Sequence, residues 1–260
     1  MDKKIRTLSL MVLLIIFKPL ESNSQGYNGK ALYKIKLAED ALIFKGSLMF
    51  DNKHSIFKWK QKDTSRWFVE EDPKDEFSTF QVVLTDTTGH AVLRNYDEVQ
   101  VKVRSFCQQG KANIYFDTLE FKWFITNETQ TIKGLNCIKA TSSFRGREYV
   151  AWFTPSVPIS AGPWKFSGLP GLIVQIIDLQ NDIYISLESL QFDDQMDLVT
   201  DDLEGEIITR KEFFECLSLE WVKYYNKNKA NIARLQAEFP DLDISDNNLP
   251  IQRPATELEF

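Results

Sequence analysis

The stretch GPWKFSGLPGLIVQII, residues 162–177, contains several turn-forming glycines and prolines, followed by one of the most apolar runs of the chain. Proline presets φ at the second position of a β-turn and glycine supplies positive φ at the third, so residues 169–172 are predicted to form a type II turn. Trp164 and Phe166 are expected to pack beneath it as anchors. A rigid corner that leads into a buried strand is the favoured interpretation, and a ligand-contacting loop is the alternative.

Short alternating or β-branched runs, separated by polar turns, predict strands on both sides of this stretch. Between strands, DNKH (51–54), Arg145-Gly146 and residues 179–181 predict hairpin turns, and the charged segment 61–79 predicts a long loop. Neighbouring hairpins without interleaved helices are typical of a large, curved antiparallel sheet built as a meander. The predicted strands cover residues 31–37, 46–50, 55–60, 80–85, 90–95, 99–103, 113–117, 121–126, both halves of 134–154, 171–178 and 182–192.

The pattern changes to helical after residue 208. Thr209 and Glu212 form a capping box, in which each side chain satisfies a free amide at a helix start. An apolar face at spacings of three and four residues follows and stops before Pro240, which predicts a long amphipathic helix packed on the sheet. A ligand shelf is the alternative interpretation of this face. Its members are Phe214, Leu217, Trp221, Tyr225, Ile232, Leu235 and Phe239.

Residues 1–24 have the plan of a secretory signal peptide. Lys3, Lys4 and Arg6 precede an apolar run over residues 8–17, and small residues follow at 22–24. The run is short for a bilayer, so a membrane anchor is the weaker alternative. We therefore expect an exported protein with a single β-rich domain over residues 25–240 and an extended acidic tail over 241–260. Because no cysteine lies near the cleavage point, a lipid anchor is not expected.

The charge balance excludes one class of partner. The 260-residue chain has a formal net charge of −6. This is unlike the basic surface that nucleic acid requires. Of three cysteines, Cys107 and Cys137 fall in strand-like segments and are the predicted disulfide pair in an oxidising compartment. Cys216 lies in the helical pattern and is interpreted as a small buried apolar residue.

The sequence contains little recognisable catalytic chemistry. With His54 and His90 as the only histidines and no paired Cys/His spacing, no metal or cofactor site is predicted. Asp178, paired with Glu148, is a candidate for carboxylate-based hydrolysis near the 155–171 loop. The simpler role for Asp178 is to end its strand and bond turn amides.

Two further groups are candidate contacts for a ligand or partner. Arg145 and Arg147 flank a predicted hairpin tip and are able to hold a carboxylate or phosphate, or to pair with Glu148 or an aromatic ring. Trp152, like the loop aromatics Trp164 and Phe166, offers apolar contact area. The full candidate set is Arg145, Arg147, Trp152, Trp164, Phe166 and Asp178.

Residues 131–182 closely resemble the signature of the GLPGLI family of bacterial secreted proteins. The hexapeptide stands intact, and the preceding matches run in order from residue 132 onward. The resemblance implies a signal peptide, an envelope or secreted location in Gram-negative bacteria and a mostly β fold, but no reaction. The hexapeptide consists of Gly168, Leu169, Pro170, Gly171, Leu172 and Ile173, and the earlier matches include Gly134, Cys137, Phe144, Arg147, Trp152, Pro158 and Gly162.

These observations lead to two hypotheses of function. A curved antiparallel sheet with a long helix is an α+β, mainly β half-barrel similar in plan to periplasmic lipoprotein carriers, which hold an acyl chain between sheet and helix. We therefore expect a non-enzymatic protein that binds an apolar small molecule or lipid, or else an outer-membrane or other envelope protein. The alternative is a secreted hydrolase that uses the carboxylates near residues 155–171.

Overall fold

The structure is a computed structural model that describes residues 28–37, 42–59, 89–108, 110–180, 182–193, 195–196 and 199–238. The predicted signal peptide, the charged segment 61–79, the strand predicted over 80–85 and the tail over 241–260 lie outside these residues.

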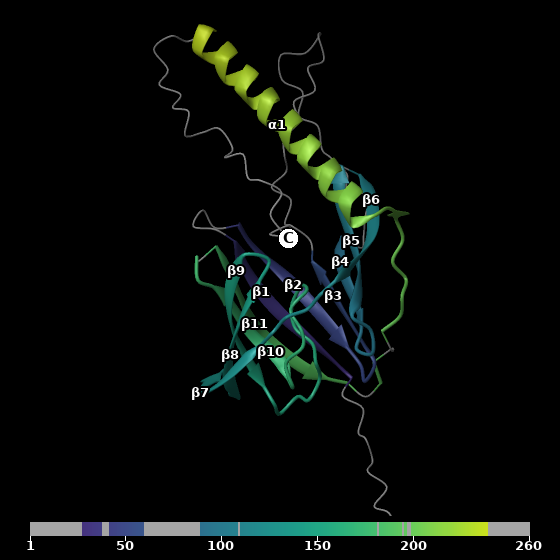
Figure 1. The fold of residues 1–260 in the computed structure, drawn as a ribbon, viewed down its shortest axis with the longest axis vertical. Coiled ribbons are helices and arrows are strands. Elements are labelled where there is room, and N and C mark those ends of the chain that lie inside the picture. The colour runs from purple at the N-terminus through teal and green to yellow at the C-terminus, as the bar shows by residue number, and fades with distance from the viewer. Residues whose placement is uncertain are drawn as a thin grey trace, which may run out of the picture.

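The described chain is mostly β, with one large antiparallel-dominated sheet and a C-terminal helix (Figure 1). The strand order is β12-β6-β5-β4-β3-β2-β1-β11-β10-β9-β8-β7. Neighbours pair antiparallel except β12, which runs parallel to β6. The elements are β1 (Gly29–Leu37), β2 (Leu42–Phe50), β3 (His54–Trp59), β4 (His90–Asn95), β5 (Gln100–Gln108), β6 (Lys111–Thr118), β7 (Phe124–Ile132), β8 (Leu135–Phe144), β9 (Arg147–Thr154), β10 (Leu172–Asp178), β11 (Ile183–Phe192), β12 (Glu206–Ile207) and α1 (Arg210–Glu238).

The predicted antiparallel meander is confirmed within β1 to β6 and within β7 to β11, but β6 and β7 lie near opposite edges, so the sheet consists of two meanders and not one. Arg145 and Gly146 both have positive φ, as do Lys133 and Gly134, which is the conformation of tight two-residue hairpin turns. The strand predicted over 121–126 begins only at Phe124. The three residues before it cross over β8 instead, and the centroids of the Phe121 and Phe144 rings are 4.1 Å apart.

The sheet is so strongly curved that distant strands meet. Arg145, in the β8–β9 turn, forms an ion pair with Asp117 of β6 at 2.6 Å. Seven strands separate β6 from β9 in the sheet order. In a flat sheet these two strands would lie far apart, because each added strand moves the edge outward by about 4.8 Å. The face on the inside of this curve is called the inner face here.

The segment of residues 155–171, called the plug, fills the space enclosed by the inner face. Its apolar side chains are buried. Burial of each large one contributes roughly 1.5–3 kcal/mol. The plug is held at its end by backbone bonds, in which Leu172 N–H donates to Val157 and Ile173 N–H to Ala161. Its buried apolar members are Val157, Ile159, Ala161, Trp164, Phe166 and Leu169.

The predicted type II turn at 169–172 is wrong, because Gly171 does not have positive φ. The left-handed glycine of the motif is Gly168, with φ of 93°. Gly171 N–H instead donates to Leu169 C=O at 2.8 Å, which closes a three-residue turn around Pro170. Glycine is required at 171 for space, since a Cβ there would lie 2.3 Å from the carbonyl oxygen of Thr154.

The helix begins as predicted, but only its first turns pack. Thr209 N–H donates to the Glu212 carboxylate, and Glu212 N–H donates to the Thr209 hydroxyl, which is the predicted capping box. Phe213 is buried against Tyr115, with ring centroids 4.6 Å apart. Farther along, the helix extends away from the sheet, and the main described contacts of α1 with other elements are with β5 and β6 (Figure 1). The expectation of a helix packed along its length is therefore wrong.

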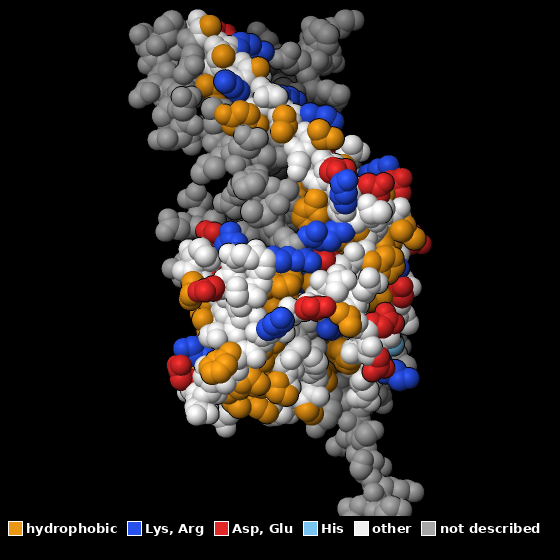
Figure 2. Space-filling view, in the orientation of Figure 1, with side chains coloured by type: hydrophobic (Ala, Val, Ile, Leu, Met, Phe, Trp, Pro, Cys, Tyr) orange, Lys and Arg blue, Asp and Glu red, His pale blue; other side chains and the backbone are white. Residues whose placement is uncertain are grey.

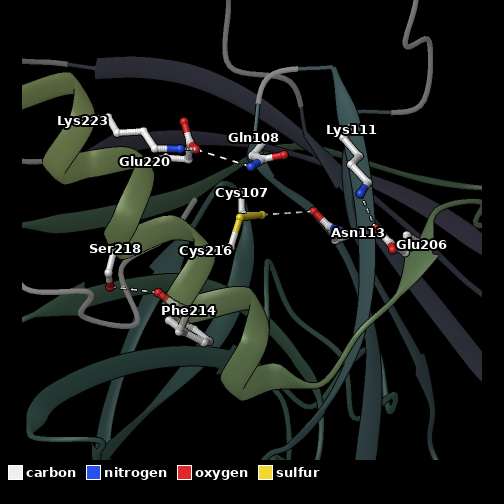
Figure 3. Close-up of a disulfide and its surroundings, with 10 residues drawn as sticks. All are labelled: Cys107, Gln108, Lys111, Asn113, Glu206, Phe214, Cys216, Ser218, Glu220 and Lys223. Carbon is white, nitrogen blue, oxygen red and sulfur yellow. Dashed lines mark hydrogen bonds and ion pairs between the residues drawn. A yellow bond between two sulfur atoms is a disulfide. The ribbon is translucent and has the colours of Figure 1, made fainter. Parts of the chain in front are cut away.

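The disulfide joins the helix to the sheet, so the predicted Cys107–Cys137 pair is wrong. Cys107 of β5 is bonded to Cys216 of α1, 109 residues away, and Figure 3 shows the bond between helix and strand. Cys137 is a buried free thiol on β8, and its S–H donates to the Leu135 carbonyl. Strand-like patterns around two cysteines could not reveal that the start of α1 lies over β5 and β6.

The outer face of β3 to β6 has a small second core. Ile56, Ala91 and Ile114 pack there against Val199 and Leu203 from the segment that follows β11. This segment then leads into β12 and the helix, so it covers the sheet beside the β6 edge.

Candidate functional site

Asp117 of β6 lies at a point where four parts of the fold meet. Its carboxylate accepts hydrogen bonds from both terminal nitrogens of Arg145, at 2.6 and 3.1 Å. Lys165 of the plug donates from Nζ at 2.7 Å, and Nε of Arg210 at the start of α1 lies 3.3 Å away. Asp117 and Lys165 are only 1% and 3% exposed. We call these four residues the Asp117 cluster.

The cations of the Asp117 cluster are held by aromatic rings as well as by charge. Arg145 lies over Phe144 and Arg210 over Phe214, with 4.7 and 4.4 Å from guanidinium carbon to ring centroid. Although burial raises the pKa of Asp117, the hydrogen bonds from Arg145 and the charge of Lys165 lower it overall. The cluster therefore stabilises the curved sheet most when the carboxyl group of Asp117 is ionised.

A second charged group lies at the β9–β11 end of the sheet. Arg147 donates to the carboxylates of Asp178 and Asp182 at 2.6 and 3.0 Å. Asp178 also accepts the backbone N–H of Ile183 at 2.8 Å. This is the predicted role of ending the strand and bonding the turn. Arg145 and Arg147, although two residues apart, thus serve different carboxylates and do not form a joint anion clamp.

The candidate carboxylate pair Asp178 and Glu148 is not brought together. Asp178 is fully buried opposite Tyr149, which is buried on the same face. Glu148 precedes Tyr149 in the strand and is exposed, so its side chain points to the other face. A paired-carboxylate mechanism requires both groups to line one pocket. The prediction of such a site at these two residues is therefore wrong.

The candidate aromatic residues also lie in different parts of the structure. Trp164 and Phe166 are buried within the plug, as expected for anchors, and their ring centroids are 5.4 Å apart. Trp164 adopts a left-handed backbone conformation with φ of 53°, which is unfavourable for a large side chain. Trp152 is half-buried, and its neighbours Ala151 and Phe153 are the buried ones, so it faces away from the plug.

The histidines lie at separate places on β3 and β4. His54 follows the Asp51 turn, and the His90 ring stacks on Trp59 and contacts the Ser105 hydroxyl at 2.9 Å. Within the described ranges, no group of three or more His, Cys, Asp or Glu side chains is placed to hold a metal ion. In the same residues no helix is long and apolar enough to cross a membrane.

Among the described residues, the cavity beside the plug is small. A cavity between the plug and β2 to β5 offers about 10 Å³. This is enough for roughly one water molecule. The cavity is lined by both polar and apolar residues, including Phe57, Arg94, Lys165 and Phe166. An acyl chain requires far more space than this.

The outer edge of β7 is the most open part of the sheet among the described residues. β7 stands last in the strand order, and all nine of its residues are exposed or half-buried. Phe124 and Ile125 are 71% and 44% exposed at its start (the same end of the molecule is visible at the lower left of Figure 1). Glu128 is the only charged residue of the strand, and it pairs with Lys139 of β8.

Three residues of the Asp117 cluster were not predicted as functional. Asp117 lies near the end of a short predicted strand, Lys165 is one lysine in a turn-rich stretch, and Arg210 follows the helix cap. The available signal was Lys165 between Trp164 and Phe166, which were predicted to be buried anchors, because a lysine in a buried segment requires a counter-charge.

Comparison with known proteins links the chain to a family of undetermined role. Residues 144–175 match a family described as "Protein of unknown function (Porph_ging)". The match covers β9, the plug and the first part of β10. No curated protein matches the chain.

The fold is similar to part of a known structure. Two crystal forms of PNGF-II, in space groups C2 and P21, superpose with TM-scores of 0.51 and 0.50 at 12% and 13% sequence identity. The match covers 74% of this chain but only 32% and 33% of those chains, so this protein spans about a third of their length. At this level of identity the similarity concerns the fold alone.

Proposed function

We propose that this protein is an exported, non-enzymatic binding protein that captures an extended segment of a bacterial envelope protein along β7. The supporting observation is the open outer edge of this nine-residue strand. Unpaired backbone donors and acceptors at such an edge bind an added strand by continuing the ladder of hydrogen bonds. Natural edges are protected by short strands, charged side chains, proline or bulges. β7 has nine residues with one charge and no proline, and its bulge lies before Thr129, so the part after the bulge is a regular edge.

The register of the β7–β8 hairpin identifies the backbone groups that face outward. Ile132 and Leu135 flank a two-residue turn, so they form a hydrogen-bonded pair. Hydrogen-bonded and non-hydrogen-bonded pairs alternate along an antiparallel ladder. Thr131 therefore belongs to a non-hydrogen-bonded pair, and its N–H and C=O point away from β8. The register shifts between Ile125 and Thr129, so the regular docking edge begins after this bulge. Phe124 and Ile125 then offer apolar contacts beside it.

The partner is a protein segment in this proposal because the interior is occupied by the plug. We propose that the sheet is a variant of the half-barrel plan of lipoprotein carriers, in which the plug fills the position of an acyl chain. We also propose export by a signal peptide over residues 1–24 without a lipid anchor, and membership of the GLPGLI family on the intact hexapeptide at 168–173.

A proline substitution tests strand addition directly. Thr131→Pro removes the outward N–H and leaves the ladder to β8 intact, because proline is tolerated at sheet edges. Thr131→Ala is the matched control, since it removes the side chain but keeps the backbone donor. Each purified protein is cross-linked in a bacterial envelope extract, and captured proteins are identified and titrated. A protein bound by the native chain and by Thr131→Ala, but at least tenfold more weakly by Thr131→Pro, supports the proposal.

Two results would contradict the proposal. Equal affinity of the partner for Thr131→Pro and Thr131→Ala would show that the β7 edge is not the docking surface. Stoichiometric lipid released from the purified protein, detected by native mass spectrometry with lipid extraction, would favour a carrier instead.

A further inference from the structure

The inner face of the sheet carries an arginine, Arg94 of β4, next to the plug. Arg94 lies opposite Ser55 of β3 and Val101 of β5, and Val101 lies opposite Asp117 of β6. Residues directly opposite one another in an antiparallel sheet point to the same face. Arg94 therefore points inward, in the same cross-strand row as Asp117 and two strands away from it.

Arg94 lines the small cavity between the plug and the sheet. The cavity's polar lining includes Ser55, Arg94, Lys165 and Ser167, and its apolar walls include Phe57 and Phe166. Two residues with cationic side chains thus line one space, Arg94 from the sheet and Lys165 from the plug. The cavity volume is about 10 Å³. Such a space suits a single particle close to water in size, which includes a small halide ion.

The charge of Arg94 is not compensated by the described chain. Arg94 is half-buried as a residue. Its Nε and Nη1 atoms are buried and have no hydrogen-bond partner among the described residues. By contrast, Arg147 is bound by Asp178, and Arg104 donates to the carbonyl oxygens of Glu204 and Gly89. Burial lowers the pKa of Arg94, in the direction expected for a desolvated cation.

Lys165 does not relieve this imbalance. Its ammonium group binds Asp117, and the single negative charge of that carboxylate is already shared with Arg145 and Arg210. Buried donor atoms of a cation that lack a partner are unfavourable, and native proteins compensate them with an acceptor or an opposite charge. The interior beside the plug therefore has a surplus of positive charge at Arg94.

We propose that this cavity binds a halide ion, with Arg94 as the principal ligand and Lys165 as the second cation. Chloride has the required charge and the compact shape that a space of this size demands, whereas a phosphate group requires more room and more donors. The proposal is independent of strand addition at β7, because the cavity and the β7 edge share no residue.

Thermal unfolding in matched salts tests the proposal. The native protein is unfolded in sodium chloride, sodium bromide and sodium gluconate at equal ionic strength, where gluconate is too large to enter. We expect a melting temperature a few degrees higher in chloride than in gluconate, because a bound anion stabilises the folded state. Bromide, a slightly larger halide, should shift the melting temperature in the same direction.

Substitution assigns the shift to the cavity. Arg94→Met keeps the length of the side chain but removes the cation, and it should abolish the difference between chloride and gluconate. Lys58→Met, at a half-buried lysine of β3 that lies outside the cavity lining, should retain the difference. The proposal is overturned by equal melting temperatures of the native protein in all three salts, or by an unchanged shift in Arg94→Met.

A second measurement covers the case in which Arg94→Met does not fold. The chloride resonance in a nuclear magnetic resonance spectrum broadens when the ion exchanges with a protein site, and bromide should reverse the broadening for the native protein. Broadening that bromide does not reverse, or no broadening at all, would also overturn the proposal.

Discussion

The two edges of the sheet differ in how much of the chain holds them. At the β6 edge, β12 adds two paired residues, α1 begins over β5 and β6, and the Cys107–Cys216 disulfide joins helix to sheet. Asp117, the residue that the other members of the Asp117 cluster bind, belongs to β6 itself. At the β7 edge, the described contacts between elements come mainly from β8. Figure 2 shows charged side chains gathered near the β6 side, below the helix.

The difference between the two edges predicts which substitutions affect folding and which affect partner binding. The covered edge is held by contacts between residues far apart in the sequence, so substitutions there should act on folding. The open edge contributes few buried contacts, so substitutions there should leave folding nearly unchanged and act on binding.

Loss of the Asp117 carboxylate should have the largest effect. Asp117→Asn keeps the shape of the side chain but leaves Arg145, Lys165 and Arg210 without a negative charge. Breaking a buried ion pair by removing one partner costs about 3–5 kcal/mol, so the free energy of unfolding in urea should fall by this amount. Asp182→Asn is the control, because its ion pair is more exposed. Such a pair should contribute less than about 1 kcal/mol.

The same cluster predicts how stability depends on pH. The pKa of Asp117 is lower in the folded protein than its usual value of 3.8. The folded state therefore binds this proton less tightly than the unfolded state, so the stabilisation is present above the usual pKa and is lost as the pH falls through the folded pKa. Urea unfolding between pH 6 and 3 should show a steeper loss for the native protein than for Asp117→Asn, and equal slopes would refute this.

Removal of the disulfide should have the next largest effect. Cys216→Ser opens the covalent loop between two cysteines that lie 109 residues apart. Loss of such a bond typically costs about 2–4 kcal/mol. Denaturant unfolding under oxidising conditions measures the loss, and a reducing agent should remove most of the difference from the native protein. Cys137→Ala should retain one intramolecular disulfide by mass spectrometry of unreduced digests. A disulfide that involves Cys137 in the native protein would contradict the observed pairing.

The helix cap should have a moderate effect at the same edge. Thr209→Ala removes a hydroxyl that accepts the Glu212 N–H. The loss of such a cap costs about 1 kcal/mol. Chemical unfolding measures the change, and Thr209→Ser, which keeps the hydroxyl, should behave as the native protein. An unchanged free energy of unfolding for Thr209→Ala would mean that the first turn of α1 does not depend on its cap.

Substitution at the open edge should have the smallest effect on folding. Phe124 is largely exposed. Phe124→Ser should therefore change the free energy of unfolding by about 0.5 kcal/mol or less. Affinity for the partner proposed above should nevertheless fall, because an apolar contact beside the docking edge is lost. A loss of several kcal/mol in stability would show that the β7 edge is covered and would remove the contrast between the two edges.

Features that depend on neighbouring residues could be predicted from the sequence. Most described strands, the hairpin at Arg145-Gly146 and the capping box at Thr209 were predicted, because each depends on residues within a few positions of one another. The burial of Trp164 and Phe166 followed in the same way from the turn chemistry around an apolar run. The amphipathic pattern of α1 predicted a helix, but it did not reveal that only the first turns pack.

Contacts between groups that are far apart in the sequence could not be predicted from it. The partner of Cys107, the counter-charges of Asp117, the opposite faces of Asp178 and Glu148, and the lack of a described partner for Arg94 all depend on how the sheet curves around the plug. Gly171 shows the same limit within the motif itself, since its role comes from the close Thr154 carbonyl and not from its own φ. Local sequence patterns carry the period of a strand or helix, whereas curvature is the sum of twist and packing over the whole sheet.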